Sequence, residues 1–152
     1  MIIAKFVIPG RLMSLNEYDV DARANRLKVA RDKKSMMLVA ALAIREAAIR
    51  QIDGPVDICI RWIEPTRRRD WDNVTFAKKA ILDDLQKENV IPSDSSKRIP
   101  EPTIDLGSYD RLKPRIEVYI KPYKREMRFK GWEDDLTEEL GFNPFNMEEE
   151  HE

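Results

Sequence analysis

Residues 56–94 read VDICIRWIEPTRRRDWDNVTFAKKAILDDLQKENVIPSD, and the fold is decided in this stretch. Its first eight residues alternate between apolar and mostly polar side chains, which predicts a strand over 56–63 that is buried on one face. The apolar positions of this strand are Val56, Ile58, Ile60 and Trp62. Pro65 ends the strand, so that Arg67, Arg68, Arg69 and Asp70 fall in a loop at the strand end.

The residues after this loop have the spacing of a helix. Apolar side chains recur three and four positions apart, which predicts a helix over 74–88 that packs on a sheet. These side chains are Val74, Ala77, Ile81 and Leu85. Asp72 or Asn73 suits the N-cap of this helix, and Asn89 suits the left-handed residue that often ends one.

Three further strands and a second helix are predicted from the remaining sequence. Residues 2–8 are β-branched and apolar, and residues 103–109 and 116–121 carry the other two strands. Apolar residues three and four positions apart from about Ser35 to Ile52 predict a helix, which Asp53-Gly54-Pro55 would end. The polar, basic segment before Ser35 could be a loop that enters this helix somewhere after Asp19. We therefore expect an α+β fold, with a sheet of about four strands and two main helices packed on it.

The composition limits the classes of protein and of site. At 152 residues the chain is long enough for one domain with a real core. One cysteine, Cys59, excludes a disulfide framework, and with His151 as the single histidine a Cys/His zinc site is nearly excluded. Neither a signal peptide nor a membrane-spanning run of about 18 apolar residues is visible. We expect a soluble, cytoplasmic protein with no membrane partner, whose metal would be a hard cation held by oxygen.

Charge is distributed unevenly along the chain. Residues 131–152 hold nine acids and no lysine or arginine, which leaves residues 1–130 with 27 basic and 19 acidic residues, a net charge of +8. A basic body favours a polyanionic partner. We expect one folded domain over 1–122 and an acidic C-terminal tail over 123–152, part of which can be disordered. The tail would fold back over a phosphate-binding face, reach a partner protein through its aromatic residues, or only raise solubility.

Acids and cations stand close together in the loop after the central strand. In an Asp-x-Asp loop, Asp70 and Asp72 can face one cation, and Mg²⁺ prefers one or two carboxylates plus water and phosphate oxygens. A helix of about 16 residues runs roughly 24 Å away and six extended residues return about 20 Å, so that Asp94 can complete the site. Asp83 lies about 16 Å along the helix and is expected to pair with Lys79. Taken one by one, the acids also fit plain helix caps, and the arginines a solvated turn.

The combination of these residues resembles a known family. Arg68-Arg69-Asp70-x-Asp72-Asn73, a helical lysine, Asp83-x-Leu85, Val90-Ile91 and an acid at position 94 look like the RusA family of Holliday junction resolvases. These are small endodeoxyribonucleases common in phages and prophages. Leu15-Asn16-Glu17-Tyr18 and Pro114-Arg115-Ile116-Glu117-Val118 match the longer, phage-type branch, and the resemblance covers about residues 2–121.

The resemblance implies an architecture, a cofactor and an assembly. It implies a mixed sheet with helices, and a homodimer that nicks four-way DNA junctions with Mg²⁺ or Mn²⁺. The family's metal-binding acids fall on Asp70, Asp72 and Asp94. Its catalytic lysine falls on Lys79, with Lys78 as the alternative.

We therefore hypothesise a structure-selective endodeoxyribonuclease that resolves four-way junctions by metal-assisted phosphodiester hydrolysis, in DNA recombination and repair. Two alternatives remain: a protein that binds branched DNA without cutting it, and a module that binds a partner protein through its acidic tail. The acid trio favours the nuclease, because a carboxylate repels DNA unless a cation neutralises it. The residues expected to contact DNA are Arg67, Arg68, Arg69, Lys78, Lys97 and Arg98.

Overall fold

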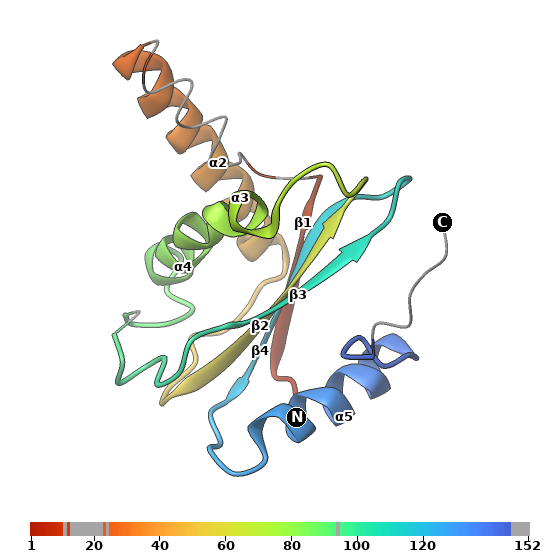
Figure 1. Cartoon of the computed structure of the whole chain (residues 1–152). Helices are drawn as coiled ribbons and strands as arrows, with labels where there is room; N and C mark the ends of the chain where they lie inside the picture. The colour runs from red at the N-terminus through yellow and green to blue at the C-terminus, as the bar shows by residue number, and fades with distance from the viewer. Residues whose placement is uncertain (11, 13–22, 24, 94, 147–152) are drawn as a thin grey trace.

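The computed structural model describes residues 1–10, 12, 23, 25–93 and 95–146, and its framework is a four-stranded sheet (Figure 1). The strands, in the order β1-β4-β2-β3 across the sheet, are β1 (Ala4–Pro9), β4 (Arg115–Pro122), β2 (Val56–Glu64) and β3 (Ile104–Tyr109). β4 is antiparallel to both of its neighbours, whereas β3 is parallel to β2. The predicted α+β class, with a mixed sheet of about four strands, is confirmed.

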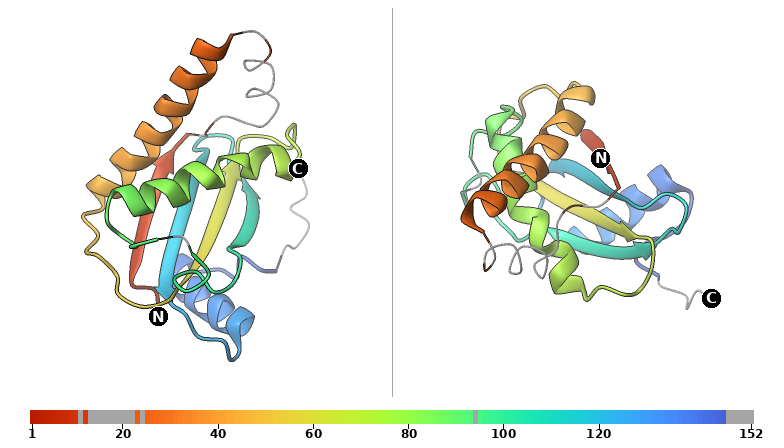
Figure 2. Two further views of the ribbon diagram at one scale, coloured as in Figure 1. Left: turned by 90° about the vertical axis from the view of Figure 1, so that its left-hand side faces the viewer. Right: turned by 90° about the horizontal axis from the view of Figure 1, so that it is seen from above.

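Helices cover both faces of the sheet (Figure 2). The face that we call the front carries α2 (Arg26–Glu46), α3 (Trp71–Val74), the 3₁₀ turn η1 (Thr75–Ala77) and α4 (Lys78–Lys87). The back face carries α5 (Arg128–Leu140), a helix that the sequence pattern did not predict. Among the described residues, no helix is both long and apolar enough to cross a membrane.

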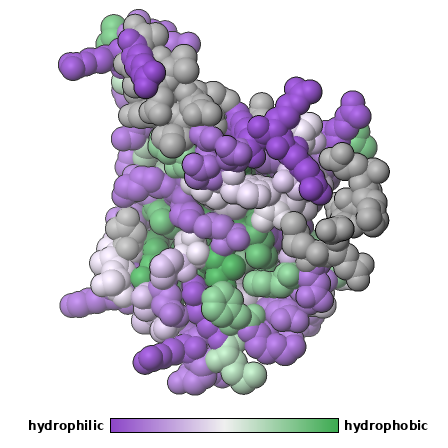
Figure 3. All heavy atoms as spheres, viewed as in Figure 1, coloured by the Kyte–Doolittle hydropathy of each residue, from purple (hydrophilic) through white to green (hydrophobic). Residues whose placement is uncertain are grey.

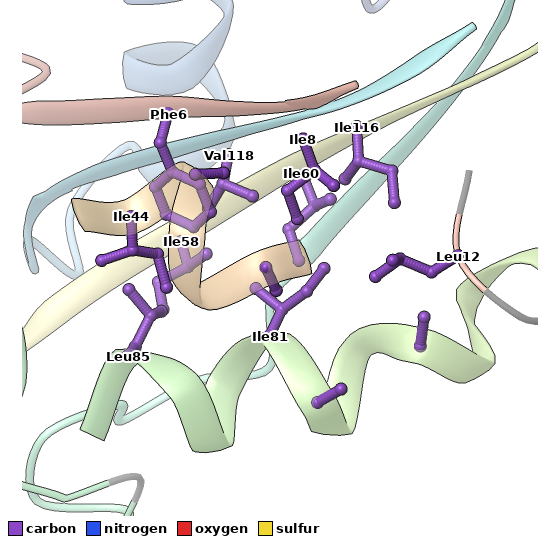
Figure 4. Packing of buried hydrophobic residues seen from close by; sticks show 14 of the residues in the cluster. Phe6, Ile8, Leu12, Ile44, Ile58, Ile60, Ile81, Leu85, Ile116 and Val118 are labelled. Carbon is purple, nitrogen blue, oxygen red and sulfur yellow. The ribbon is translucent and has the colours of Figure 1, made fainter. Parts of the chain in front are cut away.

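The front face holds the main hydrophobic core (Figure 4). Apolar side chains of β1, β2 and β4 meet those of α2 and α4. Ile81 and Leu85 of α4 point toward the sheet and are 0 % exposed, and Ile44 of α2 belongs to the same cluster. Because this packing fixes α4 on the sheet, the short helix before it, α3, is fixed at the end of β2.

The back face combines a small apolar cluster with ion pairs. The cluster consists of Cys59, Ile104, Tyr119, Trp132 and Leu136. Arg128 donates hydrogen bonds of 2.8 and 2.9 Å to the buried carboxylate of Asp57, which also accepts a 3.0 Å bond from Trp132 Nε1. Lys121 Nζ pairs with Asp135 of α5 at 3.0 Å. Only two residues of α5 are buried, so its apolar pattern was too short to predict it.

The first helix begins within the range that the sequence allows, after Asp19, but its predicted end was wrong. α2 begins at Arg26, because the side chain of Asn25 accepts hydrogen bonds from the backbone N–H groups two and three positions on, at 2.9 and 3.4 Å. The helix ends at Glu46, earlier than predicted, and Ala48 then takes a left-handed φ of 51°.

The start of the second predicted helix also differs. Asp70, rather than Asp72 or Asn73, is the N-cap residue, and η1 divides the helix into α3 and α4. The carboxylate of Asp70 makes no capping hydrogen bond. Asn89 takes a left-handed φ of 57° after α4, as predicted.

β2 is buried on both faces, which corrects the prediction of a half-buried strand. All nine residues are buried, including the charged Asp57 and Arg61. The cause is α5, which covers the face that was expected to meet solvent.

Candidate active site

Loops from all four strands meet at one end of the sheet, which we call the loop end. β2 and β3 finish there, where the backbone N–H of Asp110 donates to the carbonyl of Glu64 at 2.9 Å. β1 finishes and β4 begins there, joined by a 2.9 Å bond from the N–H of Gly10 to the carbonyl of Pro114. Since α3 directly follows β2, its first residues also lie at the loop end (Figure 1).

Asp70 and Asp72 present two exposed carboxylates at the loop end. Asp70 is the N-cap residue of α3, and Asp72 lies in the first turn of that helix. Neither carboxylate forms a hydrogen bond or an ion pair with another described residue, although three arginines immediately precede them. Both carboxylates are therefore open to a cation from solvent.

Trp71, between the two acids, is seated against β3. A Cβ atom added to Gly107 would lie 2.3 Å from Cζ2 of Trp71, so only glycine leaves room for the indole ring. The centroids of the Trp71 and Tyr109 rings are 5.7 Å apart, and the guanidinium of Arg67 lies 4.9 Å from the centroid of the Tyr109 ring. This seat fixes α3 to the edge strand and so positions the two carboxylates beside Trp71.

The three arginines of the loop take different positions. Arg67 and Arg68 are exposed, and Arg67 stacks on the Tyr109 ring. Arg69 turns inward, with Nη1 3.8 Å from Glu64 Oε1 and 3.4 Å from the carbonyl of Leu12. We infer that Arg69 fastens the loop to the buried end of β2, which leaves Arg67 and Arg68 as the surface cations of this loop.

The two candidate lysines have different partners. Lys78 Nζ pairs with the carboxylate of Asp105 on β3, whose Oδ1 accepts a 3.0 Å hydrogen bond from Trp62 Nε1. Lys79 Nζ lies 2.8 Å from Asp83 Oδ1, which confirms the predicted pair one helical turn apart. The Lys79 side chain is 73 % exposed, against 30 % for Lys78, so Lys78 is the more firmly held of the two.

The predicted acid trio is described only in part, because Asp94 lies outside the described residues. Among the residues with a described position, no three acids, histidines or cysteines come close enough together to hold a metal ion. Asp70 and Asp72 alone still fit Mg²⁺, which commonly takes one or two protein carboxylates and completes its shell with water and phosphate oxygens.

The predicted DNA contacts at Lys97 and Arg98 lie at the other end of β2. The backbone N–H of Val56, the first residue of β2, donates to the carbonyl of Arg98 at 2.7 Å. Eight steps along an extended strand separate this end from the loop end, roughly 26 Å. Lys97 and Arg98 therefore do not share a patch with Arg67 and Arg68.

The sequence analysis missed two cations that do lie at the loop end. Arg111 and Lys113 are exposed in the turn between β3 and β4. Asp110 shapes this turn by accepting 3.1 Å hydrogen bonds from two backbone N–H groups, and the bond from Lys113, with one from Arg115, lowers the pKa of the Asp110 carboxyl. We call Arg67, Arg68, Arg111 and Lys113 the basic rim. The signal for the turn was an aspartate that precedes basic residues and a proline between two strands.

No protein-family model matches the chain, and no curated protein matches it. The resemblance to the RusA family therefore rests on the motif residues of the sequence alone.

Proposed function

We propose that the protein is a metal-dependent endodeoxyribonuclease that cuts four-way DNA junctions, as RusA-type resolvases do. The observation that carries this proposal is the pair of exposed carboxylates, Asp70 and Asp72, which stay unpaired among the described residues although they neighbour the basic rim. A surface built only to bind phosphate gains nothing from acids at this place, since each acid repels DNA until a cation neutralises it. Cations and unpaired acids together fit a site where a divalent ion joins protein to phosphate.

The acids would supply the metal ligands. Asp70 and Asp72 would hold Mg²⁺ or Mn²⁺, with Asp94 as the third predicted ligand. When bound, such an ion activates a water molecule and stabilises negative charge on phosphate oxygens. The Trp71 seat keeps the first two carboxylates in one fixed arrangement, which a metal site requires.

The cations would bind and stabilise the phosphate. Arg67 and Arg68 would hold the DNA backbone at the loop end. Lys78 or Lys79 would offset the charge that develops on the phosphate in the transition state. The partners of the two lysines, Asp105 and Asp83, keep each ammonium group in place before DNA arrives.

The main test is cleavage of a labelled four-way junction with Mg²⁺. Asp70→Asn and Asp72→Asn should each lower the rate at least about 100-fold, because losing a metal ligand removes several kcal/mol of transition-state stabilisation. Junction affinity without divalent metal should be unchanged or higher. Asp94→Asn should behave like the other two. Asp53→Asn is the matched control, since it removes the same charge from an exposed residue just before β2, at the other end of that strand from the loop end.

The two lysines are separated by Lys78→Gln and Lys79→Gln. By the family pattern, Lys79→Gln should lower the cleavage rate without lowering junction affinity. A loss confined to Lys78→Gln would move the role to the lysine held by Asp105.

A homodimer is part of the proposal. A resolvase cuts two strands placed symmetrically in the junction, and a two-fold dimer supplies two sites related by that symmetry. Sedimentation at micromolar concentration should give a dimer. A monomer, both with and without junction DNA, would contradict this.

One observation favours the alternative of a junction-binding protein that cuts nothing: no third acid joins Asp70 and Asp72 among the described residues. This alternative predicts no cleavage with Mg²⁺ or Mn²⁺. It also predicts that Asp70→Asn changes junction affinity equally with and without the metal.

A further inference from the structure

The N-terminal half of α2 projects beyond the sheet and buries no described side chain. From Arg26 to Ser35 no residue with a described side chain is buried, whereas Met36, Ala40 and Ile44 in the second half enter the core. Ten residues make about 15 Å of helix. In Figure 1 and in the left view of Figure 2, this half extends past the loop end. Most helices in proteins are stabilised by the packing of an apolar face. The projecting half buries no described side chain, so it has no evident role in the core.

The projecting half is strongly basic. Residues 26–34 contain five basic residues and one acid. Three of the cations, Arg26, Arg31 and Lys33, are exposed and form no ion pair with another described residue. No acid occupies the first turn, so cations stand at the positive end of the helix dipole, where they are unfavourable. An anion bound from outside the chain would stabilise these cations and the positive end of the helix dipole.

Two of these cations, Arg26 and Lys33, continue the side of α2 that packs on the sheet, whereas Arg31 lies on another side of the helix. Lys33 lies three positions before Met36 and seven before Ala40, and Arg26 lies seven positions before Lys33, so these residues share one side of the helix. Past the end of the sheet, this side faces toward the loop end. Figure 3 shows hydrophilic side chains at the projecting end of α2 and over the loop end, and hydrophobic ones lower on the same face.

We propose that the N-terminal half of α2 binds the phosphate backbone of duplex DNA, so that one arm of a junction lies against this helix and the basic rim. Duplex DNA carries one charge per about 1.7 Å, so 15 Å of helix passes about nine phosphate charges. The inference rests on the proposed function for its choice of partner, and it does not depend on Asp70 or Asp72.

The test compares two triple variants with the same change of charge. The first combines Arg26→Gln, Arg31→Gln and Lys33→Gln. The control combines Arg50→Gln, Lys124→Gln and Arg125→Gln, which are exposed residues in the segments before β2 and after β4, away from the loop end. Affinity for a four-way junction and for a linear duplex is measured without divalent metal, between about 50 and 200 mM salt.

The α2 triple variant should lose at least about tenfold in affinity near 100 mM salt, and its slope of log affinity against log salt should fall by about 2 to 3, or about 0.9 per lost phosphate contact. The control should change affinity less than about threefold and the slope by less than about 1. Circular dichroism checks that the helix remains, and Lys33→Gln alone, which should lower the slope by about 1, gives a second measurement if the triple variant unfolds.

Equal losses from the two triple variants would overturn the proposal, since net charge alone would then explain them, and so would no loss from the α2 variant. Weaker binding to phosphatidylserine vesicles with unchanged DNA affinity would overturn it in favour of a lipid surface. If the wild type fails to cut junctions with Mg²⁺ but the α2 variant still binds DNA less tightly, the nuclease proposal fails and the DNA-binding surface stands.

Discussion

The two faces of the sheet are held in opposite ways. The front face meets α2 and α4 through apolar side chains, whereas the back face meets α5 through a small cluster surrounded by ion pairs such as Arg128 with Asp57. Truncating one side chain in an apolar core lowers the free energy of unfolding in two ways: the contacts of that side chain are lost, and a cavity is left behind. Removing one partner of a buried ion pair costs more than the pair contributes, because the other charge stays buried. The back face should therefore be the more sensitive to single substitutions.

The largest effect is expected at the centre of the back face. Arg128→Met should destabilise the protein by about 3–5 kcal/mol, because it leaves the buried carboxylate of Asp57 with a single donor, Trp132 Nε1. Urea unfolding followed by circular dichroism measures the loss. The double variant Asp57→Asn, Arg128→Met should recover much of it. A loss of stability below about 1 kcal/mol for Arg128→Met would contradict the expectation that the back face is the more sensitive to single substitutions.

The matching change on the front face should cost somewhat less. Leu85→Ala should destabilise by about 2–4 kcal/mol, through lost burial and a cavity under α4. Leu82→Ala, in the same helix but only partly buried, is the control and should cost about 1 kcal/mol. Variants that keep a single tryptophan let fluorescence follow each face separately, since Trp62 is buried at the front and Trp132 at the back. Equal costs for the two leucine variants would contradict the assigned core.

One acid, Asp84, is buried in the packing of the front face and makes the stability of the protein depend on pH. Asp84 is 2 % exposed, and its Oδ2 atom has no hydrogen-bond partner among the described residues. Burial raises the pKa of Asp84 from 3.8 to about 6. Because the folded-state pKa is the higher one, the stability gained on protonation is complete below the unfolded pKa and is lost as the pH rises through about 6.

Asp84→Asn should therefore raise stability near pH 8 by about 1–3 kcal/mol and remove this pH dependence. Asp83→Asn, next to it and paired with Lys79, should change stability by only a few tenths of a kcal/mol. The measurement is the free energy of unfolding in denaturant between about pH 5 and pH 8. If this free energy varies with pH in the same way for the wild type and Asp84→Asn, Asp84 is not the source of the pH dependence.

The back face should respond to pH in the opposite direction. Burial raises the pKa of Glu117, but hydrogen bonds from Tyr119 and Arg115 and the charge of Arg61 together bring it below its ordinary value. A lowered folded-state pKa gives stability that is present above the unfolded pKa and lost as the pH falls. Acid should thus weaken the back face only below about pH 4.5, whereas it relieves Asp84 on the front face already as the pH falls through about 6.

The smallest effect is expected at the rim of the back face. Lys5→Gln removes the ion pair with Glu139 of α5, in which the lysine side chain is 59 % exposed. Such pairs contribute less than about 1 kcal/mol. The same urea titration should show a loss within this limit, which shrinks further at about 1 M salt. A loss as large as that of Arg128→Met would mean that exposed ion pairs such as Lys5 with Glu139, rather than the buried pair of Arg128 with Asp57, hold α5 on the sheet.

Sequence reasoning found the elements whose apolar side chains repeat. The strands and the helices of the front face follow from such repeats, and the Lys79–Asp83 pair and the left-handed Asn89 follow from local geometry. α5 was missed because two buried residues make no period and because its remaining contacts are polar. The burial of Asp57 was missed for the same reason, since a charge in a strand predicts solvent unless its partner is known.

Much of the candidate site depends on residues distant in sequence. Asp70 and Asp72 were expected at a strand end and do lie there, exposed. The seat of Trp71 on Gly107 joins a helix to an edge strand, and only the isolated glycine in a predicted strand pointed to a close approach. The inward turn of Arg69 could not be predicted, since three consecutive arginines look alike until the fold places them.

β4 lies between β1 and β2 in the sheet although it is the last of the described strands along the chain. During synthesis, β1 and β2 therefore leave the ribosome without the neighbour that they share. At about 5–20 residues per second, the 58 residues from the end of β2 to the end of β4 take roughly 3 to 12 seconds. Throughout this time the apolar strands keep open edges, the state in which nascent chains associate with one another. Folding is thus a late event for this chain, and slow translation would lengthen its exposure to chaperones and proteases.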